Sequence, residues 1–574
     1  MNSDFPVYTT PNECQDCYKC VRHCISKAIR IVNARAAVIP ELCVSCGECV
    51  KVCPAHAKKI RSDLSRAQHL VADSAPVYAS VAPSFIGYFD KLTIGQLAAG
   101  LKKLGFAGVS ETALGAQLVS AQVAAALAEM KSGVMISSAC PSVVEFITKY
   151  HPDWVDAITE VASPVVAHTR LLHSLFGQPA KVVFFGPCAA KKLEADKMPA
   201  DLALALTFPT LQRWFDDAGI NPAALAEEPL TPYAAEEGRA YSLEGGMLDT
   251  LRTADPSIRY IAVSGLDDLG RLLSGVNRAE LGRGKLFIEA LACPGGCVNG
   301  PAMRPGASNA ATVVNTLGFG NNRTSVGREV PVNIHKGYFR QQLPPDEVTP
   351  EQMTEALASV GKFSSEDELN CGGCGYNTCR EFARAQIAGR AEPAMCLSYL
   401  RKISQKTSNA LIKYIPTGVV LADRQLQVIE CNRPFAELCG GETLTAFDNC
   451  GTLQGALLET MIEFTDLFDE ALKSGGEIER LNQVYGNKIL NISVFSITPG
   501  QTVGAVIQDV TKSELRREQV AEKAREVIRK NVLTVQKIAR DLGEHMAETE
   551  ILLDEVAGIY SEHHLNQPGA PAEK

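Results

Sequence analysis

Residues 14–24, CQDCYKCVRHC, and residues 43–54, CVSCGECVKVCP, repeat one cysteine spacing, C-x2-C-x2-C-x3-C, close to the N-terminus. Thiolates at this spacing hold [4Fe–4S] clusters, and disulfide bonds and zinc are the less specific interpretations of such cysteines. The chain has 574 residues and 19 cysteines in all. The two runs therefore predict two iron–sulfur clusters in the first part of the chain.

The repeated run is the one found in two-cluster bacterial ferredoxins, where the fourth cysteine of each run binds the other cluster. Ile25 stands where proline usually follows the first run, a departure that leaves every ligand in place. We therefore expect a ferredoxin-like domain over residues 1–70. One of its clusters would be held by Cys14, Cys17, Cys20 and Cys53, and the other by Cys43, Cys46, Cys49 and Cys24.

The composition excludes several classes of protein. A formal net charge of -9, without a long Lys/Arg run, argues against nucleic acid as a partner. No apolar stretch reaches the roughly 20 residues of a membrane helix, and the N-terminus shows no export signal. Because its thiolates are reserved for metal, the protein is expected in the cytoplasm of a cell with reducing, anaerobic metabolism.

Residues 77–301 alternate strand-like apolar runs with amphipathic helices, as in VYASVAP before IGQLAAGLKKLGF, and KVVFFGPC before TFPTLQRWFDDAG. The alternation predicts an α/β fold whose functional loops follow the strands. Thiolates from three distant loops indicate a further metal centre, with free buried thiols as the alternative. The cysteines concerned are Cys140, Cys188, Cys293 and Cys297.

The loops around these cysteines resemble the catalytic domain of iron-only [FeFe] hydrogenases. The three signatures of that family are TSCCPxW, MPCxxKxxE and ExMACxxGCxxGG. This chain has SSACP at residues 137–141, GPCAAKKLE at residues 186–194 and EALACPGGC at residues 289–297. The resemblance implies a multidomain α/β protein with an H-cluster domain over residues 77–345.

The resemblance also implies roles for individual residues. The cubane of the H-cluster would be held by Cys140, Cys188, Cys293 and Cys297. Cys297 would also bridge to a two-iron subsite that carries CO, cyanide and an azadithiolate. Lys191 aligns with the lysine that pairs with a cyanide ligand, which is a charge-assisted hydrogen bond. The positions that line the subsite correspond to Pro83, Ser84, Ser163 and Pro187.

The chain departs from the family at the proton relay. Ala139 replaces the cysteine that passes protons to the azadithiolate amine, and a methyl group cannot carry a proton. The family's methionines beside the cluster become Gly186 and Leu291. Because a general acid or base contributes about 10²–10⁴-fold to rate, we expect slow H2 oxidation and proton reduction. The segment that supplies relay glutamates in the family instead offers Gln117, Ser120 and Gln122.

Residues 350–404 carry one more group of four cysteines, with the spacing C-x2-C-x4-C-x16-C. Four thiolates among glycines suit another [4Fe–4S] cluster, with a four-thiolate zinc site as the alternative. The segment resembles a small four-cysteine cluster domain of corrinoid and electron-transfer proteins. Its place after the catalytic domain suggests an electron exit through Cys371, Cys374, Cys379 and Cys396.

Residues 407–510 predict a helix, two strands joined at ADRQ, a helix opened by Asn432, and two later strands joined at PGQT. With Pro416, Gly418 and Asp423, this pattern resembles a PAS domain. No residue identifies a haem or a flavin. The three spare cysteines fit no cluster spacing and are expected to be core or loop thiols: Cys431, Cys439 and Cys450.

Residues 511–562 predict one long charged helix, followed by a disordered tail over residues 563–574. Its apolar or small residues recur at three-four spacing, which suggests a parallel coiled coil and a homodimer, with packing on its own domain as the alternative. Asn531, His545 and Thr549 fall on the same spacing. The apolar and small positions are Ala521, Ala524, Ile528, Val535, Ile538, Leu542, Leu552, Val556 and Ile559.

These features together predict a sensory, PAS-linked [FeFe] hydrogenase with three [4Fe–4S] clusters and an H-cluster. Its substrates would be H2 and protons, and a ferredoxin-like protein could exchange electrons with it. No kinase, cyclase or helix-turn-helix motif follows the long helix, so the output would pass to a separate signalling protein. Two alternatives stay open: a metabolic ferredoxin-linked hydrogenase, and a hydrogenase-like iron–sulfur scaffold without the two-iron subsite.

Overall fold

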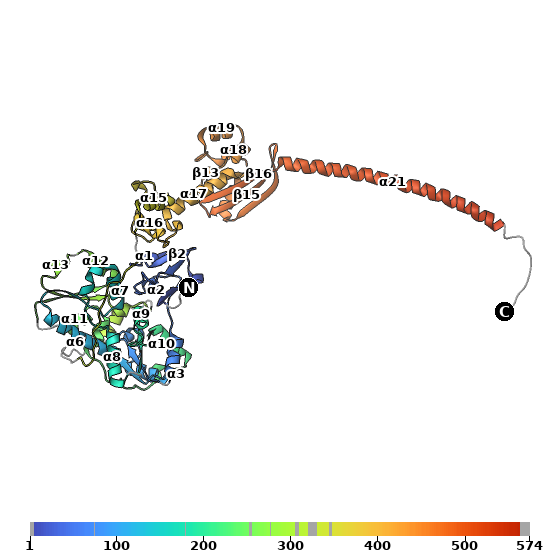
Figure 1. Ribbon diagram of the computed structural model, residues 1–574. Coiled ribbons are helices and arrows are strands. Elements are labelled where there is room, and N and C mark those ends of the chain that lie inside the picture. The colour runs from blue at the N-terminus through green and yellow to red at the C-terminus, as the bar shows by residue number, and fades with distance from the viewer. Residues whose placement is uncertain are drawn as a thin grey trace, which may run out of the picture. The chain divides into compact units, whose positions relative to one another are not determined.

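The computed structural model describes residues 5–73, 75–177, 180–251, 255–275, 277–304, 309–319, 330–343 and 347–562. The chain forms two compact units, residues 1–400 and residues 401–574, which are described separately (Figure 1). Within the described residues, no helix has both the length and the apolar character needed to span a membrane. The predicted tail, residues 563–574, lies outside the described residues.

The N-terminal segment contains two short sheets and an internal repeat. Strand β1 (Val7–Thr9) pairs antiparallel with β4 (Lys58–Ile60), and β2 (Ile29–Val32) pairs antiparallel with β3 (Arg35–Val38). The third cysteine of each run lies in a four-residue helix, α1 (Lys19–Arg22) or α2 (Glu48–Lys51). Tyr18 and Gly47 precede these helices with positive φ angles of 53° and 78°. The repeated spacing therefore gives two loops of the same local backbone.

The central segment is built on two parallel sheets, as its α/β alternation predicts. One sheet has the order β6-β5-β8-β9, and the other has the order β10-β11-β7. The four-stranded sheet consists of β5 (Val77–Val81), β6 (Gly108–Glu111), β8 (Lys181–Gly186) and β9 (Leu204–Thr207). The three-stranded sheet consists of β7 (Gly133–Ile136), β10 (Ile258–Ser264) and β11 (Lys285–Leu291).

Helices cover both sheets and bury their apolar faces in three main cores. The helices predicted in IGQLAAGLKKLGF and TFPTLQRWFDDAG are confirmed as α5 (Ile94–Lys103) and α10 (Phe208–Asp217). The remaining helices of this segment are α3 (Leu64–Ala72), α4 (Phe85–Tyr88), α6 (Ala113–Glu129), α7 (Pro141–Tyr150), α8 (Pro164–Phe176), α9 (Ala190–Lys197), α11 (Gly246–Leu251), α12 (Leu266–Gly275), α13 (Arg278–Leu281) and α14 (Asn309–Phe319).

The third cysteine-rich segment packs on the N-terminal one. It contains α15 (Pro350–Ser359) and α16 (Cys379–Ile387), and its last cysteine precedes α17 (Leu397–Tyr414). Helix α17 runs through residues 404–407, where the sequence had suggested a boundary, because no glycine or proline interrupts it there.

The second unit contains a five-stranded antiparallel sheet with the order β13-β12-β16-β15-β14. The two predicted hairpins are confirmed as β12 (Gly418–Asp423) with β13 (Val428–Cys431), and β15 (Lys488–Thr498) with β16 (Thr502–Asp509). The sequence reasoning missed β14 (Glu477–Tyr485), whose many polar residues hide the strand pattern. The helices are α18 (Arg433–Cys439), α19 (Gly441–Cys450) and α20 (Asp466–Ser474).

Asn432 begins α18, as the sequence suggests. Its side-chain oxygen accepts hydrogen bonds from the backbone N–H of Phe435 at 3.0 Å and of Val419 at 2.8 Å. Cys431 and Cys439 are half-buried beside the core of the sheet, and Cys450 is exposed, so all three lie where core or loop thiols were expected. The long helix α21 (Thr511–Glu562) is continuous, as predicted (Figure 1).

Candidate functional site

Four cysteines converge at the carboxyl ends of strands from both parallel sheets. Cys140 follows β7, Cys188 follows β8, and Cys293 and Cys297 follow β11. Burial, and after it the nearby Cys140, raise the pKa of the Cys188 thiol to about 11. The pKa of Cys297 is also raised, first by burial and then by Cys140 and Cys188. A thiol in such a place becomes a thiolate only beside a strong positive charge, which metal ions supply.

A cavity of about 90 Å³ lies against these cysteines, and Cys140, Cys188 and Cys297 form part of its wall. Most of the remaining wall is apolar, so bulk water has little to bind there. Of the residues predicted to surround a cofactor, those that line the cavity are Pro83, Ser84, Pro187 and Lys191.

Lys191 is the cation of this wall. Its ammonium donates to Glu194 Oε2 at 2.7 Å and to Ser163 Oγ at 2.9 Å, and the side chain is only 9% exposed. Ser163, which immediately precedes α8, is not part of this wall; its hydroxyl accepts the hydrogen bond from Lys191.

Two hydroxyl groups of the cavity wall are buried and have no hydrogen-bond partner among the residues that the structure describes. They belong to Ser84 and Ser242. A buried polar group without a partner costs about 1–3 kcal/mol, so a native protein normally supplies a partner. The four thiols, the ammonium and the two free hydroxyls together suit an anionic metal cofactor with hydrogen-bond-accepting ligands, and the residues present fit an H-cluster.

The N-terminal cysteines form two groups, and each group includes one cysteine of the other run. The pKa of Cys20 is raised to about 11, mainly by burial, and Cys14, Cys17 and Cys53 contribute to this rise. In the other set, the pKa of Cys43 is raised to about 11, mainly by burial, and Cys24 contributes to this rise. Cys24 and Cys43 also contribute to raising the pKa values of Cys46 and Cys49, for which burial is the main cause.

The C-terminal group of the first unit also comes together. Burial raises the pKa of Cys374, and Cys396 and Cys371 raise it further. Across the described residues, no three His, Cys, Asp or Glu side chains surround a single metal ion. A [4Fe–4S] cluster does not need its ligands around one ion, because each of its four thiolates binds a different iron atom.

Helix α7 connects the cavity to the second set of N-terminal cysteines. Cys140 precedes the helix, and Lys149 at its other end donates to the backbone oxygen of Cys43 at 2.9 Å. The hydroxyl of Tyr150 donates to the backbone oxygen of Leu42 at 2.6 Å. A second cavity of about 390 Å³ has Cys24, Cys46 and Cys293 in its wall, so the two metal groups face a common space.

The first N-terminal set shares a core with the third cysteine group. Cys20, Tyr376 and Cys396 belong to one cluster of buried residues. Lys27 donates to the backbone oxygen of Gly375 at 2.7 Å, and the backbone N–H of Ile31 donates to the backbone oxygen of Arg390 at 3.0 Å. These contacts place the second N-terminal set beside the cysteines of the cavity, and the first set beside the third group.

Comparison with known families assigns each of these regions. Residues 75–301 match the family described as iron only hydrogenase large subunit, C-terminal domain. Residues 36–59 match a 4Fe-4S binding domain, and residues 367–398 match a family described as a putative Fe-S cluster. The region that matches the iron-only hydrogenase family, residues 75–301, is called the hydrogenase domain from here on. The hydrogenase domain thus contains the cavity and all four cysteines around it.

Two curated relatives and one solved structure illustrate the relation. Iron hydrogenase 1 of Clostridium pasteurianum is 26% identical over 297 residues, covering 43% of this chain and 52% of the relative. The NADP-reducing hydrogenase subunit HndD of Solidesulfovibrio fructosivorans is 27% identical over 288 residues, covering 40% and 49% respectively. The chain thus spans about half the length of these relatives. A variant of the [FeFe]-hydrogenase HydA1 from Chlamydomonas reinhardtii aligns with TM-score 0.41 and 19% identity, covering 49% of this chain and 99% of that one.

The hydrogenase domain places Ala139 and Leu291 in the wall of the cavity. The Ala139 side chain offers no proton donor there. Gly186 ends β8 one residue before the wall, and the ring of Phe184 occupies the space beside it. Ala139 and Leu291, two of the positions that differ from the family signatures, therefore line the cavity, and Gly186 adjoins it.

Sequence reasoning missed several polar residues of the hydrogenase domain. Tyr241 lines the cavity, and its hydroxyl is bonded to that of Ser120 at 2.6 Å. The amide of Gln117 donates to Glu237 Oε2 at 2.9 Å. Glu237 and Tyr241 lie in a short helix, Glu237–Ser242, between the second and third signatures, where no spacing pattern marks them. Only their contacts with α6 could have identified them.

Glu289, the first residue of the third signature, is buried behind the cysteines. Burial raises its pKa to about 7, although hydrogen bonds from the backbone N–H groups of Leu248 and Met247 oppose this rise. The carboxyl therefore changes its charge close to neutral pH.

Proposed function

We propose that the chain is a sensory [FeFe] hydrogenase that interconverts H2 with protons and electrons slowly, at an H-cluster in the 90 Å³ cavity. The observation that carries this proposal is the cavity wall itself. It combines three of the four thiols, the Lys191 ammonium and two unpartnered hydroxyls, and it has a methyl group where the family has its relay cysteine.

Each group of the wall has a task in this proposal. When bound, the two-iron subsite supplies an open iron for heterolytic H2 cleavage and an amine that accepts the proton. Lys191 donates a charge-assisted hydrogen bond to a cyanide ligand, and Glu194 and Ser163 hold its ammonium in place. Ser84 and Ser242 donate to further ligand atoms. The apolar remainder of the wall excludes water and strengthens these interactions.

Proton transfer is the slow step in this proposal. Ala139 lies in the wall and cannot carry a proton, and Gln117 and Ser120 provide no carboxylate in the helix beside it. A missing acid or base lowers a rate by about 10²–10⁴-fold. A sensor tolerates this loss because it needs only to equilibrate with H2, whereas a metabolic enzyme does not.

Electrons would travel along the line of cysteine groups. The proposed order is H-cluster, the cluster on Cys24, Cys43, Cys46 and Cys49, the cluster on Cys14, Cys17, Cys20 and Cys53, and the cluster on Cys371, Cys374, Cys379 and Cys396. The shared cavity beside Cys46 and Cys293, and the shared core of Cys20 and Cys396, support this order. A ferredoxin-like protein could exchange electrons with any exposed cluster of the line.

The second unit would carry the output. Its antiparallel sheet and the cap at Asn432 support the PAS proposal. The apolar residues at three-four spacing along α21, which form its seam, support a homodimer. The reduction state of the clusters would alter the PAS domain and α21, and thereby a separate signalling protein. This coupling predicts a change in hydrogen exchange over residues 407–562 when H2 is added.

The test compares anaerobically matured wild type with Ala139→Cys, and with Ala139→Val as a control of similar bulk that carries no proton. Infrared bands of CO and cyanide in all three, slow wild-type turnover, and turnover raised by cysteine alone would support the proposal. Fast wild-type turnover would favour the metabolic hydrogenase. Intact [4Fe–4S] clusters without CO and cyanide bands would favour the scaffold.

A further inference from the structure

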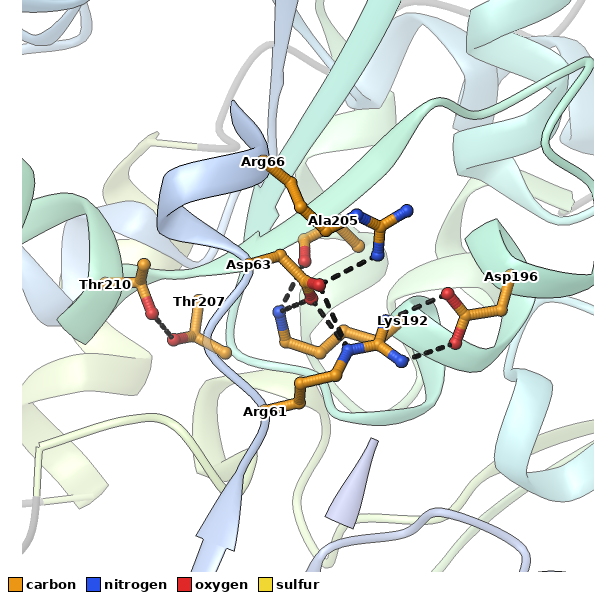
Figure 2. Close-up of polar contacts among 8 residues, drawn as sticks. All are labelled: Arg61, Asp63, Arg66, Lys192, Asp196, Ala205, Thr207 and Thr210. Carbon is orange, nitrogen blue, oxygen red and sulfur yellow. Dashed lines mark hydrogen bonds and ion pairs between the residues drawn. The ribbon is translucent and has the colours of Figure 1, made fainter. Parts of the chain in front are cut away.

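Lys192, the neighbour of Lys191, is a buried cation that faces away from the cavity. Its side chain has 0% exposure. The ammonium donates to Asp63 Oδ2 at 2.9 Å and to the backbone oxygen of Ala205 at 2.6 Å (Figure 2). Asp63 is equally enclosed, with 2% exposure, so this ion pair lies in the interior of the first unit. The pair joins positions 129 residues apart in the chain.

Asp63 is the centre of a larger network. Its carboxylate also accepts from Arg61 Nε at 3.0 Å and from Arg66 Nη1 at 2.9 Å. Burial would raise the pKa of Asp63, but the charges and hydrogen bonds of Lys192 and Arg61 outweigh burial and lower it. The carboxylate is therefore ionised whenever the protein is folded near neutral pH.

Arg61 adds a second connection to the same helix. Its two terminal nitrogens donate to the two carboxylate oxygens of Asp196, each at 2.9 Å (Figure 2). Lys192 and Asp196 are four residues apart on α9 and so lie on one face of the helix. Lys191 and Glu194 pair on another face, towards the cavity. Ion pairs with Asp63 and Arg61 thus hold one face of α9, and Lys191 lies on another face, in the cavity wall.

The anchoring segment belongs to the ferredoxin-like part of the chain. Residues 61–63 follow β4 directly, and the backbone N–H of Arg61 donates to the backbone oxygen of Pro6 at 2.9 Å. A fixed connection therefore runs from the β1–β4 sheet to the helix after Cys188. Removing either ion would break one of the two connections between α9 and this sheet without touching the cavity wall.

We propose that Asp63 and Lys192 are positioning residues, which fix the rotation of α9 so that Lys191 stays in the cavity wall beside the cofactor's anionic ligand. The role of that ligand rests on the proposed function, whereas the anchoring of α9 does not. A network that only stabilised the fold would not affect the cofactor's spectrum in the folded protein.

The experiment uses the full chain, matured with all clusters, as Lys192→Met and Asp63→Asn, each compared with wild type. The matched control is Arg66→Gln, because Arg66 binds the same carboxylate but is 59% exposed and does not contact α9. We expect the cyanide bands of Lys192→Met to shift or split, because Lys191 takes more than one position, and those of Arg66→Gln to stay unchanged. Unchanged cyanide bands in both Lys192→Met and Asp63→Asn would overturn the proposal.

Hydrogen exchange keeps the inference testable without the two-iron subsite. In protein that carries only [4Fe–4S] clusters, amides of residues 190–197 should exchange about tenfold faster in Lys192→Met, with α8 unaffected. Equal exchange in α9 would refute the anchoring, whatever the infrared result. A wild type without CO and cyanide bands would refute the proposed function alone. If Lys192→Met does not fold, Asp196→Asn removes the connection to Arg61 at a half-exposed position and should show the same faster exchange.

Discussion

The phenyl ring of Phe184 fills the space that a side chain at Gly186 would need. A Cβ atom on Gly186 would lie 2.4 Å from Phe184 Cζ and 2.6 Å from Phe184 Cε1. Phe184 also lines the cavity, so its ring stands close to where the family signature has methionine. A methionine at position 186, as in the family signature, would therefore require the ring of Phe184 to move.

This coupling predicts that Gly186→Met destabilises the hydrogenase domain, whereas Gly186→Met with Phe184→Ala is tolerated. Overpacking costs about 1–3 kcal/mol, and removing the ring should recover most of it. Both tryptophans of the chain, Trp154 and Trp214, lie in this domain, so denaturation followed by tryptophan fluorescence reports on it selectively. Equal stability of wild type and Gly186→Met would contradict the steric account.

The unpartnered hydroxyls predict a spectroscopic effect. Ser84→Ala and Ser242→Ala should shift CO or cyanide bands of matured protein, because each removes a hydrogen bond to the cofactor. Before maturation the same changes should cost almost no stability, since neither hydroxyl has a partner to lose. A matched control is Ser110→Ala, whose hydroxyl is bonded to His168 at 2.8 Å and lies outside the cavity wall. That change should lower stability and leave the bands in place.

Glu289 predicts a pH dependence of stability. Its pKa is raised from 4.5 to about 7 in the folded protein, so the folded state binds the proton more tightly than the unfolded chain. Its contribution is therefore fully present below about pH 4.5 and is lost as pH rises through about 7. Relative to Glu289→Gln, the wild type should lose on the order of 3 kcal/mol over this range. Denaturant titrations at pH 5 and pH 8 measure the difference, and parallel pH profiles would disprove the assignment.

Gly375 predicts how the third cysteine group docks. Its φ angle is +95°, and a Cβ there would lie 2.9 Å from Val21 Cγ1 and 3.2 Å from the backbone nitrogen of Arg22. Gly375→Ala should loosen the docking by about 1–3 kcal/mol, and the Ile31 amide, bonded to Arg390, should exchange at least about tenfold faster. Gly389→Ala is the control, because Gly389 also has positive φ but has no atom within 4 Å of the added Cβ.

The seam of α21 predicts a dimer. Ile538 and Leu542 are 58% and 61% exposed in the single chain, which is costly for adjacent seam positions of a free helix. The wild type should sediment as a dimer, and the double variant Ile538→Asp, Leu542→Asp as a monomer. Lys537→Asp changes charge off the seam and should remain dimeric. A monomeric wild type would show that the seam has another partner or none.

The cysteine groups and most elements of the fold could be predicted from the sequence because their signals are local. Thiolates at C-x2-C-x2-C-x3-C spacing specify a loop by themselves, and period-two and period-3.6 patterns specified the α/β domain and both late hairpins. The pattern failed at β14, where polar residues occupy most positions. The pattern also misplaced a domain boundary at residues 404–407. Helix α17 continues through these residues, because no glycine or proline there ends it.

The sequence alone determined which residues can bind metal and that Ala139 stands where the family signature has a cysteine. Only the tertiary structure decided what surrounds them. It placed Tyr241 and Ser242 in the cavity wall. It also brought Ser163 into hydrogen-bond contact with Lys191, and Lys192 into an ion pair with Asp63. Contacts between segments more than 100 residues apart arise from the packing of whole elements, as the 129 residues between Asp63 and Lys192 illustrate, and no spacing within a motif encodes them.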